Sequence, residues 1–283
     1  MSKLSISLAA RGRPELLADT IERTLRNMDG RRVKFVVALD DDDEKTVKAA
    51  QQFGGSVIVS IEPRPDTIAE KWNRVLKIAP ADVYMTMTDY APYVTPGFDQ
   101  KLIDACALFP DGIGVVYSHL ANLTFSFTNC VTAGMVKAMG GTIYPELFPY
   151  WFVDHWLDDI ARIIGRIAFA NVEVATPSQK LPTQEMREPA FWGTFYDALA
   201  PMRREIAHRI IRSRKFHETK ERKALLLNHH PLIEERSVLV NHRVRGLLGN
   251  RLLDLHDERY VRVKQRAVAM LHDMLSNPTQ KVA

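Results

Sequence analysis

The chain has 283 residues and a formal net charge of +4, and its 46% hydrophobic and 25% charged residues are ordinary for a globular protein. No apolar stretch approaches the roughly 20 residues of a membrane span, and no signal-peptide core precedes the first arginines. We therefore expect a soluble, cytoplasmic protein. Cys106 and Cys130 are too few for a disulfide framework and lack metal-ligand spacing, so we expect both to be small buried residues.

Six short runs in the first 175 residues are rich in β-branched or alternating apolar residues and predict strands. They are residues 3–10, 33–40, 56–62, 82–89, 112–118 and 167–175. Helical patterns lie between them, for example Ile68, Trp72, Val75 and Ala79 at spacings of four, three and four. Strands that alternate with helices predict an α/β fold with a mainly parallel sheet covered on both faces.

The pattern changes after about residue 176. Residues 176–193 contain three prolines and several polar residues, which indicates an ordered loop or lid, and the chain beyond Pro201 is almost entirely helical in pattern. We therefore predict an α/β domain over residues 1–200 and a basic helical region over residues 201–283.

Charge is distributed unevenly between these two regions. Residues 1–200 contain 20 Lys and Arg against 25 Asp and Glu, whereas residues 201–283 contain 18 against 9. A basic region on an acidic body favours a polyanionic partner such as DNA, because phosphates attract Lys and Arg whatever the base sequence. A solvated face on basic helices explains the same charges equally well.

The first predicted strand leads through Ala10, Arg11, Gly12 and Arg13 into a helix with Pro14 in its first turn. Exposed amides and cationic side chains at this position suit a phosphate. The segment is neither a P-loop nor a dinucleotide fingerprint, because it has no Gly-Lys-Ser/Thr and no GxGxxG pattern. A solvated strand-to-helix turn is the alternative.

The second predicted strand ends in four consecutive aspartates, residues 40–43. One of them caps the following helix, and the spacing of Asp41 and Glu44 is that of a capping box. Capping does not account for four acids. An extra carboxylate at a strand end accepts hydrogen bonds from a ribose hydroxyl or a base N–H in nucleotide-binding α/β folds, and we assign that role to Asp40.

Two further acids occupy informative positions. Asp89 ends an apolar strand and precedes a turn-rich segment, which would place its carboxylate at the carboxyl edge of the sheet, where ligands bind in open α/β folds. Asp154 follows a run of aromatics at the start of a predicted helix. A carboxylate between Trp151 and Trp156 suits a general base that deprotonates a hydroxyl, with the rings packing on a sugar or base. A simple helix cap is the alternative for Asp154.

These four segments, in this order, resemble the nucleotide-sugar glycosyltransferases of the GT-A fold, particularly the family 2-like enzymes of bacteria and bacteriophages. The resemblance covers about residues 4–175. It implies that the first loop, with Ala10, Arg11 and Arg13, holds the nucleotide together with Asp40. It also implies that Lys71 and Asn73 approach the diphosphate-sugar, although both fit equally well as surface side chains.

The same resemblance implies that Asp89 falls at the metal-binding acidic motif and that Asp154 activates the acceptor hydroxyl. The chain departs from the family pattern, because Tyr90 and Ala91 follow Asp89 where a second carboxylate is usual, and no histidine follows the last predicted strand. A single carboxylate with the donor diphosphate would hold Mn²⁺ or Mg²⁺ weakly. Arginines and lysines in place of a metal, or loss of catalysis, remain open.

We therefore predict an inverting glycosyltransferase, a hexosyl- or pentosyltransferase that uses a UDP-sugar donor. Phage relatives of this fold glycosylate hydroxymethylated pyrimidines in DNA, which makes such a base the first acceptor to consider, with a surface glycan as the second. The alternative from another class is a non-catalytic binding module that presents a basic helical arm to nucleic acid.

Overall fold

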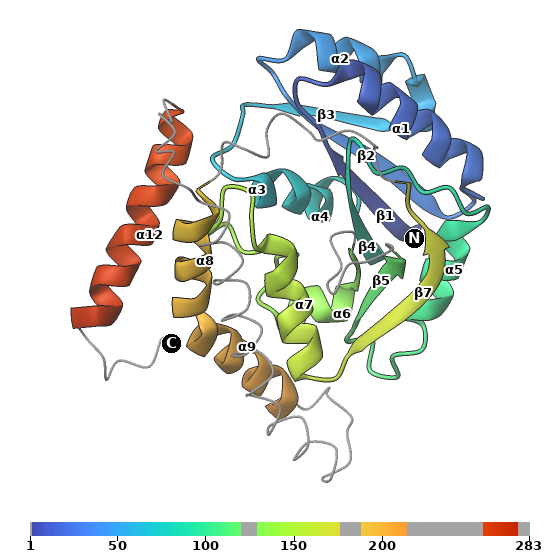
Figure 1. The fold of residues 1–283 in the computed structure, drawn as a ribbon. Helices are drawn as coiled ribbons and strands as arrows, with labels where there is room; N and C mark the ends of the chain where they lie inside the picture. Colours follow the sequence, from blue (N-terminus) through green and yellow to red (C-terminus); the bar gives the residue numbers. More distant parts are fainter. Residues whose placement is uncertain (1, 120–128, 176–187, 214–256, 277–283) are drawn as a thin grey trace.

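The protein was analysed as a computed structural model that describes residues 2–119, 129–175, 188–213 and 257–276 (Figure 1). A seven-stranded sheet forms its centre, in the order β3-β2-β1-β4-β6-β5-β7. The strands are β1 (Ser2–Ala9), β2 (Val33–Asp40), β3 (Ile58–Glu62), β4 (Ala81–Thr88), β5 (Val115–His119), β6 (Asn129–Thr132) and β7 (Ile167–Glu173). All six predicted strands are present.

Parallel pairing dominates the sheet. Strands β3, β2, β1 and β4 pair in parallel, as do β5 and β7, whereas β6 is antiparallel to both of its neighbours. The predicted mainly parallel α/β sheet is thus confirmed. Strand β6 was not predicted, because four residues are too few for an alternating pattern to stand out.

Helices cover both faces of the sheet (Figure 1). Phe35, Val37 and Leu39 of β2 pack in one apolar cluster with α1, α2 and α5, whereas Val36 faces a second cluster with the remaining helices. Successive side chains of a strand point to opposite faces, which explains why β2 is apolar almost throughout. The covering helices are α1 (Pro14–Asn27), α2 (Glu44–Gln51) and α5 (Phe98–Cys106) on one face, and α3 (Ile68–Asn73), α4 (Val75–Ile78), α6 (Ala133–Ala138) and α7 (Val153–Ile163) on the other.

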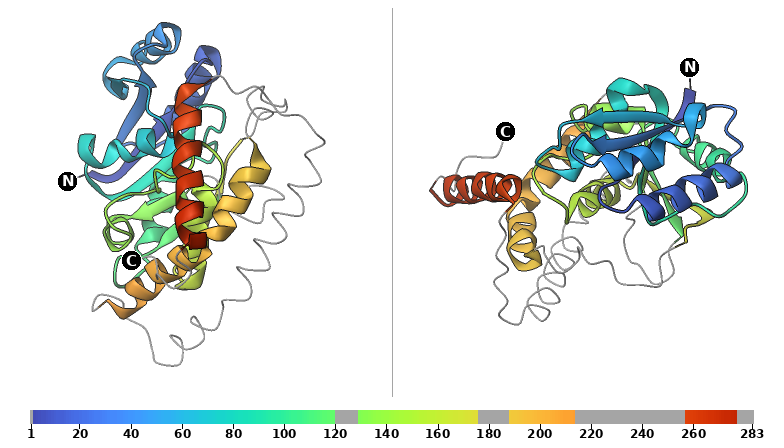
Figure 2. Two further views of the ribbon diagram at one scale, coloured as in Figure 1. Left: turned by 90° about the vertical axis from the view of Figure 1, so that its left-hand side faces the viewer. Right: turned by 90° about the horizontal axis from the view of Figure 1, so that it is seen from above.

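Three C-terminal helices extend the second cluster away from the sheet. They are α8 (Pro189–Ala198), α9 (Ala200–Arg212) and α12 (Glu258–Ser276), with α12 along the outer side of α8 (Figures 1 and 2). Tyr260, Val263 and Ala267 of α12 are buried with Trp192, whereas Val268 is 37% exposed. One apolar cluster therefore runs across residue 200, at the start of α9. Of the loop or lid predicted over residues 176–193, residues 176–187 lie outside the described residues. Residues 189–193 belong to helix α8 instead, with Pro189 in its first turn, where proline is compatible with a helix.

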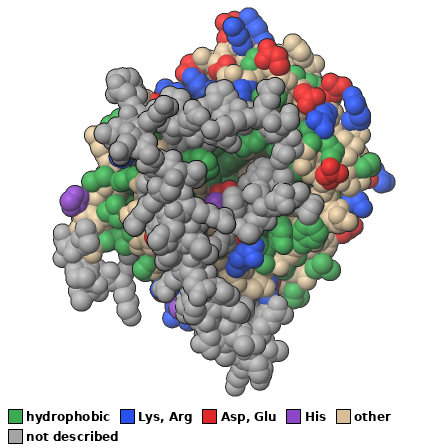
Figure 3. All heavy atoms as spheres, in the orientation of Figure 1, with side chains coloured by type: hydrophobic (Ala, Val, Ile, Leu, Met, Phe, Trp, Pro, Cys, Tyr) green, Lys and Arg blue, Asp and Glu red, His purple; other side chains and the backbone are tan. Residues whose placement is uncertain are grey.

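The exposed sides of α1 and α2 carry both signs of charge (Figure 3). Pairs spaced by four residues account for this pattern, namely Asp19–Arg23, Glu22–Arg26 and Glu44–Lys48. Such pairs support a surface helix and leave no field of a single sign there. No helix in the described ranges is long and apolar enough to cross a membrane. Cys106 and Cys130 are buried as expected, with their Sγ atoms 3.9 Å apart.

Candidate active site

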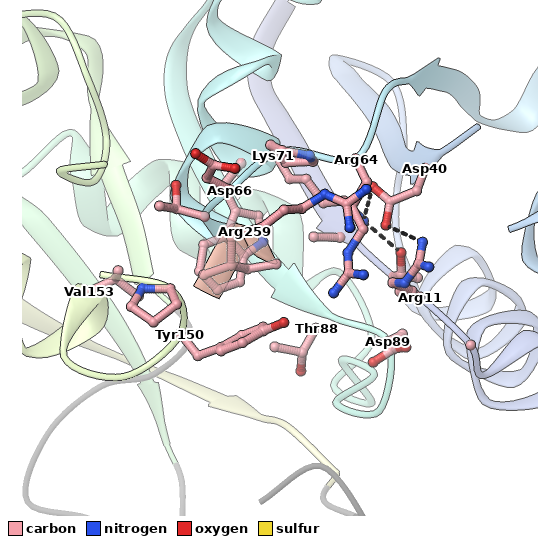
Figure 4. A pocket seen from close by; sticks show the side chains of 18 of the residues that line it. Arg11, Asp40, Arg64, Asp66, Lys71, Thr88, Asp89, Tyr150, Val153 and Arg259 are labelled. Atoms are coloured by element: carbon pink, nitrogen blue, oxygen red, sulfur yellow. Dashed lines mark hydrogen bonds and ion pairs between the residues drawn. The ribbon is translucent and has the colours of Figure 1, made fainter. Parts of the chain in front are cut away.

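A pocket of about 620 Å³ opens at the carboxyl ends of β1, β2 and β4 (Figure 4). Its volume is within the range of about 300–1,000 Å³ that is usual for small-molecule sites. The three strands are neighbours and parallel, so the loops that follow them meet at one edge of the sheet. The start of α7 and the start of α12 complete the wall.

Asp40 is the buried centre of the first half of this pocket. Its Oδ1 lies 2.7 Å from Lys71 Nζ and its Oδ2 lies 3.0 Å from Arg11 Nη1, while Lys71 Nζ also donates to the carbonyl oxygen of Ala10 at 3.0 Å. Arg11 continues outward to Asp42. Burial lowers the pKa of Lys71, and the contact with Asp40 opposes that shift. One buried carboxylate thus fixes two cations at the end of β2.

The cap of α2 differs from our prediction. Asp43, not Asp41, is the N-cap residue, and its side chain accepts hydrogen bonds from the backbone N–H groups of Thr46 and Gly12 at 3.3 Å and 2.6 Å. The predicted capping box at Asp41 is therefore wrong, because the helix begins two residues later than that box requires. Through Gly12, the cap also ties the β1 loop to the β2 loop.

Asp89 follows β4 directly and its side chain has no exposed surface. Arg13 holds it in a bidentate pair, with Nε at 2.9 Å from Oδ2 and Nη2 at 2.7 Å from Oδ1. Burial raises the pKa of Asp89 to about 6, although Arg13 acts in the opposite direction. The Arg13 guanidinium lies 5.4 Å from the centre of the Tyr90 ring. The carboxylate and the guanidinium are thus held as one unit.

A divalent cation at Asp89 would need ligands from outside the protein. Both carboxylate oxygens face Arg13, and no group of three or more His, Cys, Asp or Glu in the described ranges could hold a metal. Donor diphosphate oxygens and water would have to supply the remaining ligands. The residues thus fit a metal that arrives with the donor, not a resident one.

The other half of the pocket comes from residues 149–154. Tyr150, Trp151 and Val153 line it, and Asp154 is the second residue of α7, as predicted. Asp154 Oδ1 accepts a hydrogen bond from the backbone N–H of His155 and lies 2.9 Å from the Nδ1 atom of the His155 imidazole ring. Asp154 retains 20% exposure, so its carboxylate is open to the pocket.

The turn before Asp154 contains a strained residue. Phe152 has φ +70°, a conformation that bulky residues rarely adopt. Its ring stacks on Tyr196 with centroids 5.1 Å apart and packs near Phe148, and these contacts hold the backbone in place. Strain of this kind costs on the order of 1–3 kcal/mol and tends to occur at functional sites.

Two of the predicted site residues lie away from the pocket. Asn73 accepts hydrogen bonds from the backbone N–H groups of Ile143 and Tyr144 and donates to the carbonyl oxygen of Tyr144, so its amide anchors that loop. Trp156 is 3% exposed, with Arg203 over its ring at 5.4 Å. Neither side chain lines the pocket. The remaining predicted residues do: Ala10, Arg11, Arg13, Asp40, Lys71, Asp89, Trp151 and Asp154.

Several lining residues were not predicted. Arg64 and Asp66 follow β3, a further strand end at the same edge of the sheet, and the prolines on either side of Arg64 were a usable signal. Asp257, Arg259 and Tyr260 come from the start of α12. No local pattern marks these three, because their approach depends on how α12 packs.

No protein-family profile and no curated protein sequence matches this chain. Solved structures do. A complex of Staphylococcus aureus TarS 1–349 with UDP-GlcNAc superimposes with a TM-score of 0.61 at 13% identity, covering 94% of this chain and 81% of TarS 1–349. The chain has the GT-A fold.

A second GT-A structure is the mannosyltransferase PcManGT from Pyrobaculum calidifontis in complex with GDP-Man and Mn²⁺. It matches with a TM-score of 0.51 at 11% identity, over 99% of this chain and 81% of PcManGT. At these identities the likeness establishes the fold, and the predicted GT-A class is confirmed. The predicted family 2 and phage character stay predictions.

Proposed function

We propose that the protein is a glycosyltransferase that moves a sugar from a nucleoside-diphosphate donor to an acceptor hydroxyl. The observation that carries this proposal is the convergence of three adjacent strand ends, bearing Arg11, Asp40 and Asp89, on one pocket that Asp154 enters from α7. Cations and buried acids on one side, with an open carboxylate beside aromatic rings on the other, suit a charged donor and a sugar-like acceptor.

The donor occupies the side of the pocket with Asp40. In this proposal, Asp40 and the Ala10–Arg11 segment contact the nucleoside, and Lys71 and Arg13 face its diphosphate. A UDP-sugar is our first choice of donor, because TarS, which shares the fold, was solved with UDP-GlcNAc. A GDP-sugar is the second choice, since PcManGT was solved with GDP-Man.

Asp154 acts as the general base in a single displacement. Its carboxylate takes the proton of the acceptor hydroxyl, whose oxygen forms a bond to the anomeric carbon while the bond from that carbon to the diphosphate breaks. The electron pair leaves with the diphosphate, and Arg13 and Lys71 stabilise the developing charge. Asp89 would hold a divalent cation that arrives with the donor, and such a cation would supply further charge neutralisation. This geometry inverts the anomeric configuration.

Donor binding is the first test. Thermal unfolding is followed with UDP-, GDP-, CDP- and dTDP-sugars, with and without Mn²⁺, and one nucleotide class should stabilise the protein. Release of nucleoside diphosphate and the anomeric configuration of the product are then measured. A product with the donor's own configuration would contradict single displacement. Binding without any turnover would favour the alternative, a non-catalytic binding module.

For the acceptor we propose a hydroxyl on DNA, such as a hydroxymethylated pyrimidine, because residues 201–283 carry 18 Lys and Arg against 9 acids. In α12, Arg262 and Arg266 already pair with Asp66, and Lys264 pairs with Glu188. Contacts to DNA phosphates would therefore come from other Lys and Arg side chains of residues 201–283. If the protein makes six phosphate contacts, its affinity for DNA should fall by about 10³-fold or more between 50 and 200 mM salt. A fall of this size would support DNA as the acceptor. Salt-independent binding points to a surface glycan.

A further inference from the structure

Helix α12 is fixed against the pocket by charged contacts with two separate segments. Acids and cations on both partners take part. The contacts are Asp257 to Arg64 at 2.8 Å, Asp66 to Arg262 at 2.6 Å and to Arg266 at 3.3 Å, and Glu188 to Lys264 at 2.8 Å. These pairs connect α12 to the loop after β3, which lines the pocket, and to the start of α8.

Buried contacts reinforce this docking. The Tyr260 hydroxyl donates to Glu188 Oε2 at 2.7 Å and accepts from Trp192 Nε1 at 2.8 Å, and Tyr260 is only 5% exposed. Val263 and Ala267, one and two turns further along, are each 1% exposed. This packing fixes the backbone at Tyr260. The neighbouring residue, Arg259, therefore lines the pocket from a fixed backbone position.

The pocket-lining cations differ in how completely they are neutralised. Arg11 and Lys71 contact Asp40 at 3.0 and 2.7 Å. Arg13 contacts Asp89 at 2.7 Å, and Arg64 contacts Asp257 at 2.8 Å. Arg259 is the exception among the described residues, because its only ion pair is with Asp257, already bound to Arg64, at 3.8 Å. Its side chain is 33% exposed.

The charge of Arg259 acts on acids that follow two adjacent strands, β2 and β3. Arg11 is the main cause of the lowered pKa of Asp42, and Arg262 that of Asp66, and Arg259 adds to both shifts. Asp42 follows β2 and Asp66 follows β3, so Arg259 lies over the gap between two strand ends (Figure 4). An anion in this gap would find a guanidinium whose one ion pair among the described residues is long and shared with Arg64.

We propose that Arg259 binds the diphosphate of the nucleotide donor, which makes α12 a part of the donor site. The inference rests on the proposed function. A guanidinium donates two parallel hydrogen bonds to a phosphate. Arg259 would lose little ion-pair energy on binding one, because its existing ion pair with Asp257 is long. Because Arg259 is anchored through Tyr260, the bound diphosphate also holds α12 against the body and stabilises its docked state by mass action.

The test measures UDP and GDP binding by calorimetry for wild type, Arg259→Gln and Arg259→Lys. Loss of a charge-assisted pair predicts about 10- to 100-fold weaker binding of the preferred nucleotide by Arg259→Gln. Arg259→Lys should retain part of the affinity, because the charge persists without the fork. The parent nucleoside, which has no phosphate, should bind wild type and Arg259→Gln equally. Arg209→Gln is the control, since it removes the same charge from an exposed position on α9.

Hydrogen exchange separates ligand contact from a purely structural role. In wild type, the preferred nucleoside diphosphate should slow amide exchange in α12, and this protection should be absent in Arg259→Gln. Equal nucleotide affinity of Arg259→Gln and wild type would overturn the inference and leave the proposed function standing. Absence of wild-type binding to UDP, GDP, CDP and dTDP alike would instead overturn the proposed function. An equal loss for nucleoside and nucleoside diphosphate would assign Arg259 a structural role and also overturn the inference.

Discussion

The two halves of the pocket are built on opposite principles. In the sheet-edge half, with Arg11, Arg13, Asp40, Lys71 and Asp89, every charge already has a partner, and the Asp40 and Asp89 side chains have no exposed surface. The helix half contains Tyr150, Trp151 and Asp154 from around the start of α7 and Arg259 from α12. Its acid, Asp154, is 20% exposed, and the ion pair of Arg259 with Asp257 is long at 3.8 Å.

The difference separates two tasks. Two buried acids, Asp40 and Asp89, keep their paired cations in fixed positions before an anionic ligand arrives, so little reorganisation is needed on binding. A general base must instead remain open to the hydroxyl that it deprotonates. We therefore expect substitution of the sheet-edge acids to change stability and nucleotide affinity, and substitution of Asp154 to change turnover. Arg259 also belongs to the helix half, but its substitution should change nucleotide affinity.

The largest effect should follow from Asp154→Asn. Removal of a general base lowers the rate by about 10²- to 10⁴-fold, because no side chain is then available to take the proton from the sugar-accepting hydroxyl. Nucleotide affinity should change less than about threefold, since Asp154 lies in the helix half and holds no cation of the sheet-edge half. The measurement is release of nucleoside diphosphate at saturating donor, alongside calorimetric binding.

The matched control for that variant is Asp158→Asn on the same helix, whose carboxylate pairs with Arg162 and does not line the pocket. It should retain turnover once folded. Full activity of Asp154→Asn would contradict the assignment of Asp154 as the general base.

Asp40→Ala should cause the largest loss of stability. It leaves Lys71, whose side chain is 5% exposed, without its carboxylate, and breaking a buried pair costs about 3 kcal/mol in the free energy of unfolding. Urea unfolding measures the change. Asp42→Ala is the control, because Asp42 also pairs with Arg11 but is 45% exposed, so its loss should cost under about 1 kcal/mol. Equal losses for the two variants would contradict the distinction between buried and exposed pairs.

A third variant, Asp89→Asn, tests the burial of the second strand-end acid. The pKa of Asp89 is about 6 in the folded protein, above its ordinary value of 3.8. Between these two pKa values the folded state retains a proton on Asp89 that the unfolded chain has lost. The contribution of Asp89 to the free energy of unfolding therefore falls as pH rises from about 4 to 6. Relative to Asp89→Asn, wild type should lose about 2 kcal/mol across this window. Parallel unfolding curves for the two proteins at pH 4 and pH 7 would contradict this pKa.

The smallest effect concerns the pair that joins the two halves. In a double-mutant cycle with Arg64→Ala and Asp257→Ala, the coupling energy should be about 0.5–1 kcal/mol, because both side chains are partly exposed. The exposed helix pair Glu44–Lys48 should give about 0.3–0.5 kcal/mol in the same assay. A coupling at Arg64–Asp257 no greater than that would indicate that apolar packing alone docks α12.

Prediction from the sequence succeeded where local pattern determines structure. The β2 residues are apolar almost without interruption, as burial on both faces requires, and Asp40 ends that strand as expected. The order of strand, acid and helix start then placed Asp40, Asp89 and Asp154 in one pocket. The same reasoning missed the cap at Asp43, because four consecutive aspartates offer several nearly equivalent caps and only the backbone path selects one.

The sequence by itself determined the α/β class, six of the strands and the acids at their ends, because apolar periodicity and strand-end positions are local properties. Tertiary structure alone decided which partners those acids have. Arg13 meets Asp89 across 76 residues, and Arg64 meets Asp257 across 193. It also decided that Trp156 packs in the core and that α12 delivers Arg259 to the pocket. These outcomes depend on which helix faces pack together, and that choice is a sum of many distant contacts that no local pattern records.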